Sequence, residues 1–385
     1  MGRRSARNMR RGPSLSVRPA AVPAFAAAAY QLLAVIAALG WRRRRPKVTS
    51  ATPPISLLKP MYGRDEHLYR ALRSHAGQDY PKFEILFGVA RADDPALQEI
   101  ARLRAEFPAL SVRLIEVQTD AVNPKAAVVA RLAKEARYSL LVINDDDIEV
   151  ERNYFRTIAA LLTNPGTGLV TCLYRARAES WAARMEALGI ATDFAPSVMV
   201  ARLLGVAEFA LGATMAVRAD TLHAIGGLEP IAQYLADDYE LGRRITAAGF
   251  RVEFAPVVVE TGLGGASLKQ VWQHQLRWSR TIRVSRPGGY YGSVITNATI
   301  WALVAFAAGE WQAGLTAAAL RFTAAWCAGN LVLSDREVRR SFWLIPFRDL
   351  FGFAVWVTAC FGNTVYWRGR KLYLARNGRL TMPSS

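Results

Sequence analysis

The sequence predicts an α/β domain that is held at a membrane by apolar helices on both sides of it. Short apolar runs between residues 55 and 289, among them ISLL, FEILFGVA, YSLLVIN and TGLVTCLY, alternate with helical stretches. This alternation is typical of a largely parallel sheet with helices on both faces. Long uncharged stretches flank that region, and the excess basic residues lie beside them.

The distribution of charge favours a membrane as the partner. The 385-residue chain has a formal net charge of +18; its first 64 residues carry 13 basic and no acidic residues, and residues 368–385 carry 5 basic and no acidic ones. A nucleic-acid binder usually carries its basic residues on the folded domain itself, so we expect no nucleic-acid partner. The three well-separated cysteines indicate neither a disulfide framework nor a cysteine metal site.

Residues 20–41 carry no charge and follow a basic segment at 1–19. At about 1.5 Å per residue they span roughly the 30 Å hydrocarbon core of a bilayer, which predicts a transmembrane anchor. A cleaved signal peptide would have a shorter apolar region and a small-residue cleavage site in place of the arginines at 42–45. Because arginines stand on both flanks, the positive-inside rule leaves the orientation open.

Three apolar segments follow the α/β domain. Residues 294–309 and 313–333 predict a helical hairpin through the bilayer. The segment 342–367 is interrupted by Arg348 and Asp349, so it either spans the bilayer after this interruption or lies in the membrane interface. The expected organisation is therefore a basic segment, an anchor, an α/β domain, C-terminal membrane helices and a basic tail, at residues 1–19, 20–41, 42–292, 293–367 and 368–385.

Three adjacent carboxylates, Asp145, Asp146 and Asp147, follow the apolar run YSLLVIN directly. They repel one another unless a cation neutralises them, and ligands bind at the carboxyl ends of strands in such sheets. The outer pair, Asp145 and Asp147, can hold one divalent cation and leave positions for the oxygens of a substrate diphosphate. The alternatives are a solvated turn, or the D-x-D-x-[TV] strand end of a phosphatase, which the string DDDIE does not complete.

A second acidic pair, Asp237 and Asp238, opens an apparent helix in LADDYELGRRITAAGF. Carboxylates at a helix N-terminus are often caps. The functional interpretation is a general base that takes a proton from an acceptor hydroxyl.

The stretch 272–292 is dense in arginine, tryptophan and histidine just before the first C-terminal apolar segment. Its arginines recur every third residue and so lie near one face of a helix. They form either a membrane-interface belt or a set of donors to a departing phosphate. These arginines are Arg277, Arg280, Arg283 and Arg286.

Taken in order, these motifs resemble those of membrane-bound inverting glycosyltransferases of the GT-A fold. The match is closest to the ceramide glucosyltransferase family, with its bacterial relatives that glycosylate hopanoid lipids, and covers roughly residues 53–292. It rests on the acids after FEILFGVA, the D-x-D, the second acidic pair and an HxxRW motif, that is on Asp93 and Asp94, Asp145 to Asp147, Asp237 and Asp238, and His274 to Trp278.

The resemblance implies roles for the first two motifs. Asp93 or Asp94 matches the acid expected to hold the uracil or ribose of a UDP-sugar, and the choice between them stays open. Asp145 and Asp147 match the metal-binding D-x-D, for which the oxygen ligands suit Mg²⁺ and Mn²⁺ equally.

The later motifs are assigned in the same way. Asp238 matches the catalytic base, with Asp237 beside it. Arg277 and Trp278 match the last motif, which contacts the diphosphate and the acceptor end, and His274 stands where the commoner form of the family has Gln or Arg.

Supporting residues are assigned from their place in the sequence. Lys125 is a candidate for binding phosphate, whereas for Lys59 we favour an exposed lysine in a turn. Gly212 and the pair Gly226 and Gly227 indicate close backbone approach or a tight turn.

The resemblance implies an integral, multi-pass protein of the inner or cell membrane whose catalytic domain faces the cytoplasm. The expected reaction moves a hexosyl unit, with glucose favoured, from a UDP-sugar to the hydroxyl of a membrane lipid such as ceramide, with inversion. Transfer of N-acetylglucosamine to a hopanoid polyol is an alternative. A processive polysaccharide synthase and a non-catalytic adaptor on the same fold are further ones.

Overall fold

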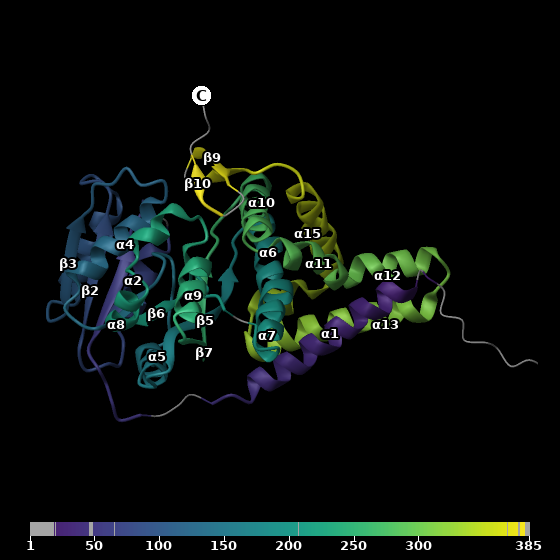
Figure 1. Cartoon of the computed structure of the whole chain (residues 1–385), viewed down its shortest axis with the longest axis horizontal. Helices are drawn as coiled ribbons and strands as arrows, with labels where there is room; N and C mark the ends of the chain where they lie inside the picture. The colour runs from purple at the N-terminus through teal and green to yellow at the C-terminus, as the bar shows by residue number, and fades with distance from the viewer. Residues whose placement is uncertain are drawn as a thin grey trace, which may run out of the picture.

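The computed structural model describes residues 19, 21–45, 49–64, 66–206, 208–367, 369–375 and 378–381. Most of the predicted basic segment and part of the predicted basic tail lie outside the described residues. At one end of the molecule lies the sheet with its helices, at the other lie α1, α12 and α13, and α6, α10 and α15 lie between them (Figure 1).

Seven strands form one sheet in the order β3-β2-β1-β4-β6-β5-β7. Strands β1 to β4 are parallel to one another, β7 is parallel to β5, and β6 is antiparallel to both of its neighbours, so the predicted largely parallel sheet is confirmed with one exception. The strands are β1 (Ile55–Pro60), β2 (Phe83–Val89), β3 (Ser111–Glu116), β4 (Leu140–Ile143), β5 (Thr167–Arg177), β6 (Met215–Arg218) and β7 (Arg251–Gly262).

Helices cover both faces of this sheet because successive residues of a buried strand point to opposite sides. On β1, Leu57 belongs to the core shared with α2, α3 and α5, while Leu58 belongs to the core shared with α4 and α9. The helices of this region are α2 (Leu68–Ala76), α3 (Ala96–Glu106), α4 (Pro124–Glu135), α5 (Tyr154–Leu162), α6 (Trp181–Gly189), the π-helix η1 (Ile190–Phe194), α7 (Ala195–Leu203), α8 (Ala219–Ala224), the 3-10 helix η2 (Glu229–Gln233) and α9 (Asp237–Ala247).

The remaining helices include the apolar stretches on both sides of the α/β domain. The two helices of the predicted hairpin are present as α12 and α13, which pack on each other and on α1 through small alanine side chains (Figure 1). Among the described residues, however, α13 does not belong to a stretch long and apolar enough to cross a membrane. These elements are α1 (Ala21–Arg42), α10 (Leu268–Ser285), α11 (Pro287–Gly292), η3 (Ser293–Thr296), α12 (Ala298–Ala307), α13 (Trp311–Trp326), the π-helix η4 (Cys327–Val332), α14 (Arg336–Ser341), η5 (Phe342–Leu344) and α15 (Ile345–Ala359).

Two helical stretches in the described part of the chain are long and apolar enough to cross a membrane, Ala21–Arg42 and Arg336–Ala359. A third is added if the pair Pro287–Thr296 and Ala298–Ala307, bent by 50°, is one broken span. Arg348 and Asp349, which interrupt the apolar segment in the sequence, lie within α15 with both side chains buried.

A small antiparallel sheet closes the C-terminal end of the chain and was not predicted from the sequence. It consists of β8 (Thr364–Trp367), β9 (Arg370–Leu374) and β10 (Leu380–Thr381), so the predicted basic tail is partly folded. Its apolar side chains pack against Val284 of α10 and against Val122 and Leu235, which precede α4 and α9. The sheet thereby braces the loops that lead into the candidate site.

Candidate active site

The three carboxylates stand at the carboxyl end of β4, in the middle of the sheet. All four residues of β4 are buried. The next residue, Asn144, is also buried and fixes the turn, because its side-chain amide donates to the carbonyl of Ala213 at 2.6 Å and to the hydroxyl of Tyr154 at 2.9 Å. The strand therefore delivers the carboxylates to a defined place.

Each carboxylate of this group has a different partner. Asp145 pairs with Lys125 at 2.5 Å, Asp146 accepts from the backbone amide of Tyr62 at 3.1 Å, and Asp147 accepts from the hydroxyl of Thr261. Burial, followed by the neighbouring charges of Asp146 and Asp145, raises the pKa of Asp147 to about 7. The group thus carries more negative charge than its surroundings neutralise, which favours a bound cation.

Lys125 lies in the first turn of α4 and reaches back to the carboxylates. Asn123 caps this helix by accepting from Ala126, and its amide donates to the carbonyl of Tyr234 at 2.7 Å. Burial alone would lower the pKa of Lys125, but Asp145 and Asp237 outweigh burial and raise it. The lysine therefore stays charged, and the cap fixes where that charge lies.

The prediction that Lys59 is an exposed lysine in a turn is wrong. It lies in β1 with no exposed surface, and its Nζ has no hydrogen-bond partner within the described residues. Burial lowers its pKa to about 8, although Asp146 and Asp147 favour the charged form. Its position between β2 and β4 decides this burial, and the run LLKP gives no sign of it.

Asp238 lies at the start of α9 and faces the first group. Its Oδ2 accepts from the backbone amide of Gly212 at 2.9 Å, and its Oδ1 accepts from that of Tyr239 at 2.7 Å. Burial and the neighbouring Asp237 raise the pKa of Asp238 to about 6. Its carboxylate is therefore held by backbone donors and close to a pKa that suits proton transfer.

Gly212 lies between Asp238 and the D-x-D. A Cβ atom on it would stand 3.4 Å from Oδ2 of Asp238 and 3.9 Å from Oδ2 of Asp145. A side chain on Gly212 would therefore stand in contact with both carboxylates. Gly226 and Gly227 have φ of 80° and 82°, which is the predicted tight turn.

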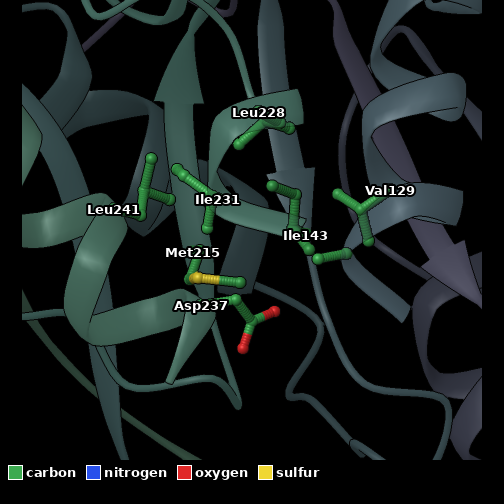
Figure 2. Close-up of a pocket in the computed structure, with 8 residues that line it drawn as sticks. Val129, Ile143, Met215, Leu228, Ile231, Asp237 and Leu241 are labelled. Carbon is green, nitrogen blue, oxygen red and sulfur yellow. The ribbon is translucent and has the colours of Figure 1, made fainter. Parts of the chain in front are cut away.

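Asp237 belongs to the same helix start but points elsewhere. Figure 2 shows its carboxylate directed away from the apolar side chains that border a small cavity beside it. Its Oδ2 lies 4.0 Å from Nζ of Lys125, and burial raises its pKa despite that lysine. The apolar residues that seat the start of α9 here include Val129, Ile143, Met215, Leu228, Ile231 and Leu241.

The structure separates the two candidates for the nucleoside-binding acid. Asp94 is buried, and its carboxylate accepts from the backbone amides of Gly63 at 3.1 Å and Ala96 at 2.9 Å. The side chain of Asp93 is 70% exposed and pairs with Arg91 at 2.6 Å. Asp94 thus fixes the loop after β1, whereas Asp93 faces solvent.

The arginines of α10 do not all face the candidate phosphate site. Arg280 donates to the carbonyl of Phe361 at 2.8 Å, and Arg283 donates to that of Gly362 at 2.8 Å, so both hold the loop after α15. These two are therefore engaged with backbone, and Arg277, Arg286 and His274 remain as candidates for the expected role at a phosphate.

His274 and Trp278 sit on α10 beside the end of α6. The ring of His274 lies 4.6 Å from that of Trp278, and its Nδ1 donates to Glu186, which is 3% exposed. Glu186 was not predicted, because it lies 88 residues away in the sequence, in a stretch without a motif.

Tyr174 of β5 is a second residue that the sequence analysis missed. It is buried, and its ring lies 5.6 Å from that of Phe194. Burial raises its pKa well above the usual value, and the carboxylates of Asp238 and Glu186 raise it further. Tyr174 therefore lies within electrostatic reach of both the candidate base and Glu186, the partner of His274.

The donor set at the D-x-D fits a hard divalent cation. Asp145 and Asp147 supply only oxygen ligands, and the raised pKa of Asp147 marks a concentration of negative charge there. Elsewhere among the described residues, one group of three possible ligands converges within 4.8 Å, Glu66, His67 and Glu179, at the more exposed rim.

Comparison with known proteins gives a family match along most of the chain. The model described as glycosyl transferase family 21 matches residues 17–380. Ceramide glucosyltransferase 1 of Caenorhabditis elegans is 27% identical over 200 residues, which cover 51% of this chain and 43% of the relative. Ceramide glucosyltransferase of Komagataella phaffii is 26% identical over 114 residues, or 28% of this chain and 22% of the relative. The chain thus matches less than half the length of these curated relatives.

A solved structure shares the fold. The mannosyltransferase from Pyrobaculum calidifontis in complex with GDP-Man and Mn2+ has a TM-score of 0.53 at 17% identity, and the match covers 89% of this chain and 98% of that chain. At this identity the likeness concerns the fold, and it confirms the predicted GT-A class.

Proposed function

The chain belongs to glycosyl transferase family 21, and from that membership we propose that it moves a hexosyl unit from a UDP-sugar to a hydroxyl of a membrane lipid. Glucose is the favoured sugar, ceramide is the favoured acceptor, and the anomeric configuration is inverted. The ceramide glucosyltransferases among its relatives support this choice of donor and acceptor.

One observation carries the proposal. Carboxylate oxygens of Asp238 and Asp145, from motifs that lie far apart in the sequence, both lie within 4 Å of the position that a side chain on Gly212 would take. A general base and a metal-binding carboxylate on two sides of one small space are what a single displacement at a sugar carbon needs.

Asp238 performs the proton transfer in this mechanism. Its carboxylate takes the proton of the acceptor hydroxyl while that oxygen attacks the anomeric carbon and the bond to UDP breaks. The backbone amides of Gly212 and Tyr239 hold the carboxylate in place. Attack from the side opposite the departing UDP inverts the configuration.

The departing diphosphate gathers negative charge and needs donors. Arg277 and His274 are proposed to supply them from α10, and Lys125 adds a buried positive charge beside Asp145. A divalent cation, Mg²⁺ or Mn²⁺, held by Asp145 and Asp147 would supply further electrostatic stabilisation of the diphosphate. Asp94 is the favoured acid for the nucleoside, because the backbone amides of Gly63 and Ala96 hold its carboxylate in place.

Placement next to membrane helices supports a lipid acceptor. Helix α10, which carries His274, Arg277 and Trp278, is followed by α11, η3 and α12, the bent pair that could form a span. A lipid hydroxyl could then reach Asp238 at the level of the headgroups. We place the catalytic domain on the cytoplasmic side of the cell membrane, where nucleotide-sugars are made.

The test is a transfer assay with purified protein in nanodiscs. Radiolabelled UDP-glucose and UDP-N-acetylglucosamine are offered with Mg²⁺ or Mn²⁺ against ceramide, a hopanoid polyol and diacylglycerol. We expect labelled glucosylceramide that disappears on chelation. A labelled hopanoid would show that the acceptor is a hopanoid and not ceramide. A labelled polymer would indicate a processive synthase. Intact UDP binding with no labelled product would reject a membrane lipid as the acceptor.

A further inference from the structure

The chain that follows the D-x-D is bonded to β7, the last strand of the seven-stranded sheet. Glu149, two residues after Asp147, forms an antiparallel bridge with Glu260, in which each backbone amide donates to the carbonyl of the other residue, at 2.8 Å and 3.0 Å. Ile148, which lies between Asp147 and Glu149, is 2% exposed and belongs to the apolar core. The backbone after the D-x-D therefore has a fixed position against β7.

The bridge sets the carboxylates of Glu149 and Glu260 opposite each other, where like charges repel. Arg177 of β5 offsets this repulsion, because its guanidinium donates to Glu149 and, at 3.0 Å, to Glu260. The second oxygen of Glu149 pairs with Arg70 at 2.7 Å. The second oxygen of Glu260 pairs with Arg175 at 2.8 Å, so all four oxygens have an arginine partner. We call Glu149, Glu260 and Arg177, whose planar fork joins the two acids, the glutamate clamp.

Thr261 follows Glu260 on β7 and contacts the D-x-D itself. Its hydroxyl donates to Oδ2 of Asp147. Successive residues of a strand point to opposite sides, so Thr261 and Glu260 hold the turn after β4 from two sides of β7. The hydroxyl engages one oxygen of the carboxylate, which leaves the other oxygen for a cation.

Asp147 depends on this hydroxyl for its orientation. Asp145 is held by the ammonium of Lys125, and Asp146 is held by a backbone amide. Among the residues that the structure describes, Thr261 is the one hydrogen-bond partner of the Asp147 side chain. The charges of Asp145 and Asp146 repel that of Asp147, so without the hydroxyl its carboxylate would be free to turn away from them.

A hydrogen bond of this kind is what a metal-binding carboxylate needs. Neighbouring residues usually hydrogen-bond the carboxylates that bind a metal and fix their orientation, and loss of such a neighbour typically costs about 10- to 100-fold in metal affinity. Asp145 and Asp147 have to present oxygens to the same cation, so the direction of each carboxylate matters. Thr261 supplies this direction for Asp147.

We propose that Thr261 is a positioning residue, which orients Asp147 as a metal ligand, and that the glutamate clamp fixes the part of β7 on which Thr261 stands. The inference rests on the proposed function, since it takes the D-x-D as the site of the divalent cation. It adds residues of β5 and β7 that no local motif marks. It does not depend on which sugar or which lipid is the substrate.

The first measurement is the binding of Mn²⁺ to the full-length protein in nanodiscs with UDP and no acceptor, followed by the loss of the EPR signal of the free ion. Thr261→Val keeps the shape of the side chain and removes its hydroxyl, so we expect the Kd for Mn²⁺ to rise about 10- to 100-fold. Thr261→Ser keeps a hydroxyl and should stay near the parent value. The Kd for UDP without metal should stay near the parent value in both variants.

Thr157→Val is the matched control. Thr157 is buried in α5, and its hydroxyl donates to the carbonyl of Asn153 at 3.1 Å, outside the candidate site. This change should leave the binding of Mn²⁺ unaltered, and its effect on the unfolding temperature measures what the loss of one buried hydroxyl costs the fold. In the transfer assay, the activity of Thr261→Val should recover as the Mn²⁺ concentration rises, whereas a loss of folded protein would persist at every concentration.

Arg177→Lys tests the glutamate clamp, because a lysine supplies the charge but not the fork that joins two carboxylates. We expect it to weaken the binding of Mn²⁺. Added to Thr261→Val, it should weaken binding by less than it does in the parent, because both changes act on Asp147. Binding free energies that simply add in the double variant would overturn the role of the clamp.

The other outcomes separate this inference from the proposed function. If Thr261→Val binds Mn²⁺ as the parent does while Asp147→Ala has lost that binding, the inference is overturned and the D-x-D stays the metal site. If Thr261→Val weakens the binding of Mn²⁺ but the parent transfers no sugar to a lipid, the proposed acceptor is rejected and the inference stands. If Asp147→Ala binds Mn²⁺ as the parent does, the metal site and the inference are both rejected.

Discussion

The backbone amide of Gly212 donates to Oδ2 of Asp238 at 2.9 Å, and the missing side chain of the same glycine leaves Asp238 and Asp145 facing a common space. One residue thus orients the candidate base and keeps its surroundings open. Both effects depend on β6 and the loop before it, which bring Gly212 between two motifs that lie about 90 residues apart.

Gly212→Ala should lower activity without lowering stability. The added methyl group would stand at ordinary contact distance from Asp238 and Asp145, and the backbone there is not in the left-handed region, so the unfolding temperature should stay close to that of the parent. The methyl group would occupy the space between the carboxylates, and we expect kcat/KM to fall roughly tenfold or more. Full activity would show that the substrate does not enter this space.

Asp238→Asn removes the proposed base and keeps the shape of the side chain. General-base catalysis contributes about 10²- to 10⁴-fold in rate, so transfer should fall by that factor. UDP binding, measured by calorimetry, should persist because the amide oxygen can still accept from Gly212. A variant that turns over at the parental rate would remove Asp238 from the mechanism.

The raised pKa of Asp238 predicts how activity depends on pH. The base is active when deprotonated, so kcat/KM should rise with pH and level off above a pKa of about 6. Folding stability has the opposite trend for this group. Its folded pKa lies above the unfolded value of 3.8, so the folded state binds the proton more tightly and Asp238 destabilises the fold as pH rises from about 4 to 6.

The measurement is a pH–rate profile of the parent and of Asp238→Asn, with the substrate well below its KM. The residual activity of the variant should lack the rise near pH 6. An identical profile in both proteins would assign that titration to another group.

The sequence predicts an element of this fold where the local run of residues already shows that the element is buried. The strands β1, β2, β4 and β5 were predicted because each is a continuous apolar run. Strand β6 is only four residues long and is antiparallel to its neighbours. It was not predicted, because its pairing partners lie far from it in the sequence. Lys59 was misjudged for the same reason, since the strands on either side bury it.

The candidate site divides in the same way. Acids that stand together in the sequence, such as Asp145 and Asp147, were found as motifs. Glu186 and Tyr174 are single residues in apolar elements, and only the packing of α6 and β5 against α10 and α9 brings them to the site. Their chemistry depends on neighbours that are distant in the sequence.

Removal of the D-x-D carboxylates should affect metal-dependent binding. Asp145→Ala and Asp147→Ala should each weaken the increase in UDP affinity that Mn²⁺ or Mg²⁺ produces, because each removes one oxygen ligand. Titration of UDP with and without metal measures this increase. Asp146→Ala is the matched control within the same turn, since its carboxylate accepts from the backbone of Tyr62. An unchanged metal effect in both outer variants would exclude the D-x-D as the metal site.

The pair of Arg321 and Asp349 should show the energetics of a buried ion pair. Arg321→Leu leaves the carboxylate of Asp349 buried without its partner and should cost about 3–5 kcal/mol, seen as a lower unfolding temperature in detergent. The double variant Arg321→Leu with Asp349→Leu removes both charges, so it should be more stable than the single variant, although it also loses the bonds to Thr192 and Thr299. Asp349→Leu alone completes the comparison. If the loss of stability in the double variant equals the sum of the losses in the two single variants, the two charges do not depend on each other, which would contradict this account of how α13 and α15 are joined.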